Sequence, residues 1–171
     1  GFAIMPHMSA PVIEKLGSKM EFETWESPFE EGTAWIIDVS WSIDKWSLTK
    51  SSGAKVEILG NPKHKDIDLI ARVFHEETEA LYELAFETVN AYRLLDEHGL
   101  LYLWSSERPK KNTFKLKGHP WHEESPLSFA MGNNQEWSHM LVTNDECLEV
   151  ICSESPKITK VENVRFSGNA T

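Results

Sequence analysis

Residues 66–97 read DIDLIARVFHEETEALYELAFETVNAYRLLDE, and this stretch decides the fold that the sequence predicts. On a helical wheel at about 100° per residue, its apolar side chains fall within one arc of about 180°. Most of its charged side chains fall on the opposite arc. Asp66 is a suitable N-cap, and Gly99 stands where the helix would end. The pattern predicts one long amphipathic helix.

The length of this helix conflicts with the expected size of the domain. A helix over residues 66–97 would span about 48 Å, whereas a domain of 171 residues has a diameter of about 40 Å. Glu77 and Thr78 also fall inside the apolar arc, where they are costly unless they form hydrogen bonds. A kink or short break near these two residues would explain both observations.

A second informative segment is AWIIDVSWSIDKWSL, residues 34–48, which contains three tryptophans. Trp35 and Trp41 stand on alternating positions with aliphatic residues, a period of two that is typical of a half-buried strand. A phase slip at residues 44–45 would return Trp46 to the same face. We interpret these rings as core side chains covered by the helix, and not as an exposed binding platform.

The next residues predict a hairpin with a defined register. A three-residue turn that ends at Gly53, where a positive φ is needed, places Leu48 opposite Val56. The same register places Trp46 opposite Ile58 and keeps one clean apolar face.

Strand patterns resume after the expected helix. They cover LLYLWSS (100–106), NTFKLKG (112–118), EWSHMLV (136–142), CLEVIC (147–152) and KITKVENVRF (157–166). Strands before and after one helix predict an α+β fold, with a mostly antiparallel sheet packed on one long helix (about 66–97), kinked or broken near Glu77. We expect residues 1–19 to be an N-terminal extension, which could include a cloning remnant, and residues 20–171 to be a single α+β domain.

Net charge, hydropathy and cysteine spacing exclude several classes of function. The formal net charge is −10, and an acidic excess repels phosphate, so nucleic acid is not an expected partner. Apolar runs are too short to cross a bilayer, so we expect no membrane contact and a cytoplasmic location. Cys147 and Cys152 are too far apart on one strand to form a disulfide, and we expect both to be buried thiols in a reducing compartment.

The two histidines of GHPWHEES, residues 118–125, are candidate metal ligands. His119 and His122 resemble half of a zinc site, and Glu123 or Glu124 could supply an oxygen. No second cluster is visible in the sequence, and His139 and His75 could join only through folding. The sequence therefore predicts no metal site and no cofactor, and leaves open whether His119, His122 or His139 binds a metal.

Four glutamates follow one another on the outer face of the expected helix: Glu76, Glu79, Glu83 and Glu87. Such a charged face would favour docking to a basic protein partner. No nucleophile motif and no phosphate loop is present, so no catalytic residue is predicted. These features predict a small acidic interaction protein that binds a cationic effector, for example a toxin-neutralising immunity protein. The oligomeric state and the identity of the partner stay open.

An alternative function is a ligand-binding or enzymatic α+β domain, with a pocket between the sheet and the helix. The basic segment RPKKNTFKLK, residues 108–117, is expected to guard an exposed strand edge, or to contact an acidic group.

Overall fold

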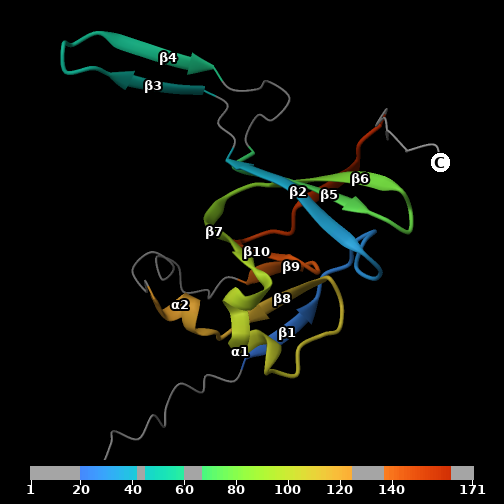
Figure 1. Cartoon of the computed structure of the whole chain (residues 1–171). Coiled ribbons are helices and arrows are strands. Elements are labelled where there is room, and N and C mark those ends of the chain that lie inside the picture. Colours follow the sequence, from blue (N-terminus) through green and yellow to red (C-terminus); the bar gives the residue numbers. More distant parts are fainter. Residues whose placement is uncertain (1–19, 42–44, 60–66, 125–136, 163–171) are drawn as a thin grey trace, which may run out of the picture.

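The computed structural model describes residues 20–41, 45–59, 67–124 and 137–162, and it is built mostly from antiparallel strands (Figure 1). Within these residues the longest α-helix is α2 (Pro120–Glu124), with five residues. The predicted α+β fold with a long helix is therefore wrong, because the chain folds into packed β-sheets. The expected N-terminal extension, residues 1–19, lies outside the described residues.

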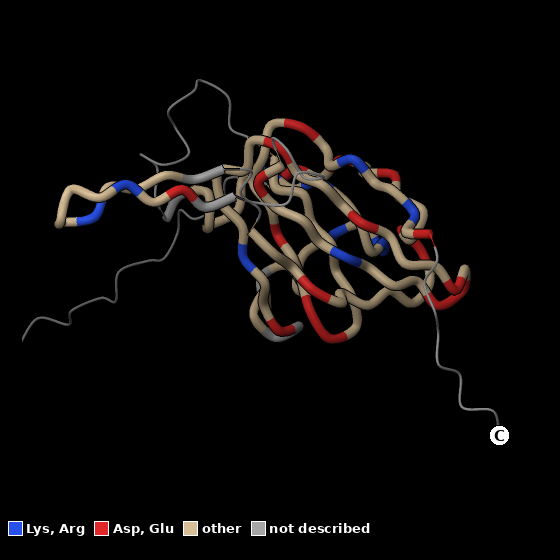
Figure 2. The backbone as a smooth tube through the Cα atoms, turned by 90° about the horizontal axis from the view of Figure 1, so that it is seen from above, with Lys and Arg blue, Asp and Glu red and all other residues tan. Residues whose placement is uncertain are grey.

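Two sheets form the body of the molecule. The first has five strands in the order β1 (Glu21–Thr24), β8 (Thr113–Lys117), β9 (Ser138–Val142), β10 (Glu146–Cys152) and β7 (Val89–Asp96). The second has four strands in the order β11 (Lys157–Lys160), β6 (Ala80–Phe86), β5 (Leu69–His75) and β2 (Ala34–Trp41). A separate hairpin of β3 (Lys45–Thr49) and β4 (Lys55–Leu59) extends away from both sheets (Figures 1 and 2).

The segment predicted as a helix forms β5, β6 and β7. Burial alternates strictly along β6, where Ala80, Tyr82, Leu84 and Phe86 are the buried residues. The turns that separate these strands contain neither glycine nor proline, so nothing in the sequence marked them. Glu79 (φ 47°) and Thr88 (φ 51°) supply the left-handed conformations instead. The position expected to be a helix kink, near Glu77, is the turn between β5 and β6.

The main core lies between the two sheets. Its buried residues include Ala71, Val73 and Leu84 from the four-stranded sheet and Leu148 and Val150 from the five-stranded sheet. Burial of apolar side chains from two facing sheets is the main stabilising term of such a fold.

The outer face of the five-stranded sheet carries a second core. Leu100 at the end of η2 (Glu97–Leu100) and Leu103 in α1 (Leu101–Trp104) pack there with Phe114 and Met140. Residues 100–106 were predicted as a strand, and they form helical turns instead.

The tryptophans of β2 do not form the core. A bulge between Ile36 and Asp38 breaks the alternation of the strand. Trp41 is 50% exposed and stacks on Tyr92, with 6.0 Å between ring centroids. Trp35 is half-buried. The interpretation of these rings as core side chains under a helix is therefore wrong.

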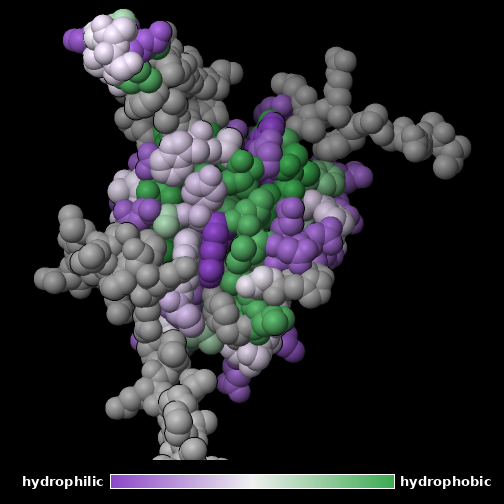
Figure 3. Space-filling view, turned by 60° about the vertical axis from the view of Figure 1, so that its left-hand side comes forward, coloured by the Kyte–Doolittle hydropathy of each residue, from purple (hydrophilic) through white to green (hydrophobic). Residues whose placement is uncertain are grey.

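Trp25 is the tryptophan that the main core buries, with its ring edge-on to Phe86. The side chains of Lys45 and Trp46 lie outside the described part of the chain, as does residue 44, where the phase slip was expected to begin. Figure 3 shows a band of hydrophobic surface over one face of the molecule. Ile37 and Leu94 are among the exposed large hydrophobic residues.

Other predictions are confirmed. Leu48 pairs with Val56 and Trp46 with Ile58, and Gly53 has a φ of 85°. Strands also form in four predicted places, at β8, β9, β10 and β11. In the part of the chain that the structure describes, no helix combines the length and the apolar character needed to span a membrane.

Candidate functional site

The predicted ridge of glutamates does not exist as one surface. Glu76 and Glu79 lie in the turn between β5 and β6, Glu83 lies within β6, and Glu87 follows β6. Eight residues of extended chain separate Glu79 from Glu87, about 26 Å at strand rise. Glu83 stands opposite Arg72 on the neighbouring strand. A role for these glutamates in partner binding stays a prediction, but they cannot act as a helix face.

Two of the four glutamates belong to a different acidic surface, which we call the acidic end. Its members are Glu30, Glu31, Glu76, Glu77 and Glu79. The segment before β2 and the turn between β5 and β6 meet there, because the Glu76 N–H donates to the Thr33 carbonyl at 3.0 Å. Figure 2 shows acidic residues at the turns on this side of the molecule, away from the β3–β4 hairpin.

Glu77 joins the two loops of the acidic end by a hydrogen bond. Its two carboxylate oxygens accept the Thr33 N–H at 2.8 and 2.9 Å. This hydrogen bond from Thr33 lowers the pKa of Glu77. Gly32, with a φ of 84°, lies directly beneath, and a Cβ there would come within 2.5 Å of the Glu77 carboxyl carbon. The positive φ and the present position of the Glu77 carboxylate both favour glycine at position 32.

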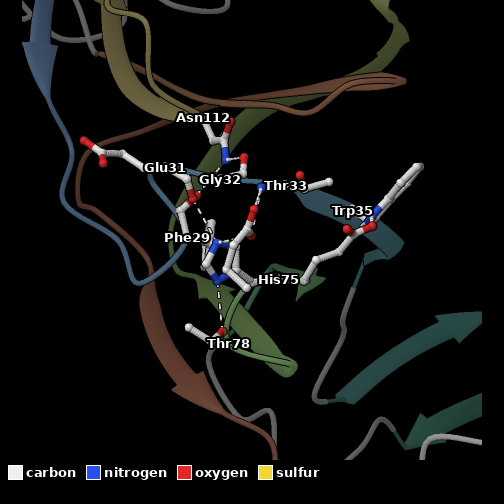
Figure 4. Close-up of polar contacts among 10 residues, drawn as sticks. Phe29, Glu31, Gly32, Thr33, Trp35, His75, Thr78 and Asn112 are labelled. Atoms are coloured by element: carbon white, nitrogen blue, oxygen red, sulfur yellow. Dashed lines mark hydrogen bonds and ion pairs between the residues drawn. The ribbon is translucent and has the colours of Figure 1, made fainter. Parts of the chain in front are cut away.

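His75 and Asn112 tie the loop before β2 to the rest of the fold (Figure 4). His75 is buried, and its Nε2 donates to the Glu31 carbonyl at 2.8 Å. Its Nδ1 contacts the Thr78 hydroxyl at 2.9 Å. The Asn112 side-chain amide donates to the Gly32 carbonyl at 3.0 Å. These bonds hold the acidic end in one conformation.

A second polar cluster lies on the outer face of the five-stranded sheet. Leu148 and Val150 of β10 point into the core between the sheets, so Glu149 points to the opposite face. The chain around α2 covers it there with His119 and His122. Both Glu149 and His119 are completely buried.

Four side chains of this cluster converge, and we call them the histidine centre: His119, His122, Ser138 and Glu149. His119 Nε2 lies 2.8 Å from Glu149 Oε1. The Ser138 hydroxyl donates to the same oxygen at 2.6 Å and contacts His122 Nε2 at 2.9 Å. Since Ser138 gives its only proton to Glu149, His122 must donate in its contact with Ser138.

Arg93 completes the charge balance of the histidine centre. Its Nε and Nη2 both reach Glu149 Oε2, at 2.8 and 2.7 Å, and its guanidinium stacks on Trp121 at 4.2 Å. Burial alone would raise the pKa of Glu149, but the hydrogen bond from His119 and the charge of Arg93 together lower it. Glu149 is therefore a buried carboxylate, paired as such a group must be.

The protonation of His122 follows from its surroundings. Burial, and then the nearby His119, lower the pKa of His122 to about 4. The ring is neutral at pH 7, which is the form in which imidazole accepts a proton or binds a metal. The side chains of Glu123 and Glu124, proposed as further oxygen ligands, lie outside the described part of the structure.

His139 does not join the histidine centre. It alternates with Ser138 along β9, so its ring lies on the opposite face of the sheet, edge-on to Trp25 at 5.2 Å. Its Nδ1 contacts Cys152 Sγ at 3.3 Å and its Nε2 contacts the Ser155 hydroxyl at 3.0 Å. Burial, and then the charge of Lys115, lower the pKa of His139 to about 4.

The cysteines match the prediction. Cys147 and Cys152 are both free and buried, and they belong to different hydrophobic clusters on the two faces of the sheet. Burial raises the pKa of Cys147 to about 12, so this thiol is not a nucleophile at pH 7.

The basic segment 108–117 does not guard a strand edge, because β8 lies between β1 and β9. Arg108, Lys110 and Lys111 instead line a shallow hollow of about 330 Å³, together with Trp104. Lys111 pairs with Glu30 of the acidic end at 3.0 Å. The pocket expected between the sheet and a helix is also wrong, because residues 67–97 form no helix of that length and core side chains fill the space between the sheets.

Comparison with known proteins adds no family to this description. Neither protein-family models, nor curated proteins, nor solved structures gave a match. The function must therefore be argued from the residues themselves.

Sequence reasoning identified only part of the histidine centre. His119 and His122 were candidates because of their spacing, whereas Glu149, Ser138 and Arg93 were not. The available signal was a charged residue in the middle of the apolar strand CLEVIC, since a buried carboxylate needs a polar partner on the same face.

Proposed function

We propose that this chain is a small interaction protein that docks a basic protein partner through its acidic end. The observation that carries the proposal is the exposure of Glu31, Glu76 and Glu79 on two loops that hydrogen bonds fix to each other. A net charge of −10 supports it, because such a field attracts a cationic protein and raises its association rate.

Hydrogen bonds hold the acidic end rigid in the free protein. The bonds from Thr33 to Glu77 and from His75 to the Glu31 carbonyl order both loops before any partner arrives. Groups that are already ordered lose less conformational entropy on binding, so their charges contribute more to affinity. Glu83 and Glu87 are not part of this surface, and the proposal assigns them no contact.

A toxin-neutralising immunity protein is the concrete form of this proposal. Such a protein needs no catalytic residue, only a surface complementary to a cationic effector. Free buried thiols fit a reducing compartment, so the proposal includes a cytoplasmic location.

The test is affinity capture from the native cell with matched charge variants. The acidic-end variant is E31K/E76K/E79K, and the control E87K/E107K/E154K makes the same change in net charge at exposed sites elsewhere. We expect the wild type and the control to retain one basic protein, and the acidic-end variant to lose it. Capture should weaken as the salt concentration rises.

Equal retention by both triple variants would overturn the proposal. Loss in the control alone would also overturn it, because the docking surface would then include Glu87, Glu107 or Glu154 and not the acidic end. Circular dichroism of each variant confirms that the sheets remain folded.

A further inference from the structure

The histidine centre has the composition and geometry of a metal site. We propose that His119, His122 and Glu149 bind a divalent transition-metal ion, with Zn²⁺ the best fit, and that the Ser138 hydroxyl lies at the fourth position. This inference goes beyond partner binding and does not depend on it, because the centre lies on a different face from the acidic end.

Four side chains bring donor atoms close together. One ligand atom from each of His119, His122 and Glu149 lies within 4.8 Å of the other two. The Ser138 oxygen lies 3.2, 2.9 and 2.6 Å from His119 Nε2, His122 Nε2 and Glu149 Oε1, in that order. Around Zn²⁺ with bonds of about 2.0–2.1 Å, tetrahedral ligands lie about 3.3 Å apart. Shifts of about 1 Å or less would give this arrangement.

The scaffold presents these atoms rigidly. Glu149 and Ser138 stand on β10 and β9, which are central strands of the five-stranded sheet. His119 and His122 are three residues apart on one turn, closed by the His122 N–H to the His119 carbonyl at 3.1 Å. That spacing brings both rings to the same side, with centroids 4.3 Å apart.

The chemical types of the donor groups favour zinc over other divalent ions. Two imidazoles and one carboxylate are the ligands of open zinc sites, which keep one position for an oxygen. Calcium and magnesium prefer all-oxygen sites, so the two histidines argue against them. No cysteine takes part, since Cys147 and Cys152 make their contacts elsewhere in the described structure.

The contacts of Glu149 are compatible with a bound ion. Both contacts of Arg93 with Glu149 are made to Oε2, whereas Oε1 faces His119 and Ser138. Such outer contacts orient metal ligands in known sites. Each histidine ring must carry its proton on Nδ1 in the bound form, because the Nε2 lone pair is then the ligand. The Ser138 proton stays on its oxygen or remains shared with Glu149.

Zinc binding can be measured directly on the whole chain. After removal of metal with a chelator, we expect calorimetric titration with zinc sulfate to show one equivalent bound. His122→Ala, at a half-buried position, should lower the affinity by more than about 100-fold, and Ser138→Ala by about 10-fold. His139→Gln, on the opposite face of the sheet, should keep the full stoichiometry.

A second readout separates the site from surface binding and from misfolding. Excess zinc should raise the thermal midpoint of the wild type and not that of His122→Ala. The acidic-end variant E31K/E76K/E79K should bind one equivalent, so failure of the partner proposal would not affect this one. Absence of stoichiometric zinc binding, or an affinity unchanged in a folded His122→Ala protein, would overturn the inference. The histidine centre would then be a hydrogen-bonded core network only.

Discussion

Gly32 is the residue on which the shape of the acidic end depends. Its φ of 84° strains any residue with a side chain, and an added Cβ would displace the Glu77 carboxylate from its present position. Gly53 offers a matched comparison, because its φ is 85° but nothing lies within 4 Å of its added Cβ.

Alanine at these two glycines should separate backbone strain from the contact with Glu77. We expect Gly53→Ala to lower the free energy of unfolding by about 1 kcal/mol, the cost of a left-handed residue with a side chain. Gly32→Ala should cost about two to three times as much, because the Glu77 carboxylate must also move. Urea denaturation measures both, and equal losses would show that the Glu77 contact does not matter.

His139 should make the stability of the protein depend on pH. Its pKa of about 4 in the folded state lies below the ordinary value of 6.5, so only the unfolded chain takes up a proton between these values. Stability is therefore full above pH 6.5 and falls as the pH falls toward 4. We expect His139 to account for about 2 kcal/mol of loss between pH 7 and pH 5.

The check is urea denaturation at these two pH values. His139→Gln should lose about 2 kcal/mol less than the wild type over that interval. His122, whose pKa is also about 4, adds to the slope in both proteins. A slope that is the same in both proteins would contradict a neutral buried His139.

Only part of the histidine centre could be predicted from the sequence. The spacing of His119 and His122 was visible, but their partner Glu149 lies 27 residues beyond His122 on another element. Strand alternation places Glu149 on the face that α2 covers, and this requires the pairing of β9 with β10. Contacts set by sheet topology could not be predicted from spacing alone.

At the level of elements, the largest error of the sequence-based prediction concerns β5, β6 and β7, which were expected to form one helix. An apolar arc of about 180° covers half of a wheel, so three short strands satisfy it as readily as one helix. Strict alternation in ALYELAF favoured a strand, but the turns at Glu76–Glu79 and Glu87–Thr88 lack the usual glycine or proline. The β3–β4 hairpin was predicted correctly because Gly53 marks its turn.

Chemical shifts can test this assignment at the level of elements. We expect backbone carbon shifts typical of strands over Leu69–His75, Ala80–Phe86 and Val89–Asp96, interrupted at the two turns. Cross-strand contacts between Val73 and Tyr82 should confirm the register. Continuous helical shifts from residue 66 to residue 97 would contradict the fold.

At the scale of the whole molecule, two sheets enclose the main core. The two proposed sites lie in separate places outside this core. The acidic end lies where the loop before β2 meets the turn between β5 and β6, and the histidine centre lies under α2. This separation lets charge variants and histidine variants report independently on partner binding and on metal binding.

The central claim is that the acidic end binds a basic partner, and the salt dependence of affinity tests it most directly. With the captured partner purified, dissociation constants are measured from low to high salt for the wild type, E31K/E76K/E79K and the control E87K/E107K/E154K. We predict a steep loss of affinity with salt in the wild type and the control, and weak, nearly salt-independent binding in the acidic-end variant. An acidic-end variant with wild-type affinity and wild-type salt dependence would contradict the claim.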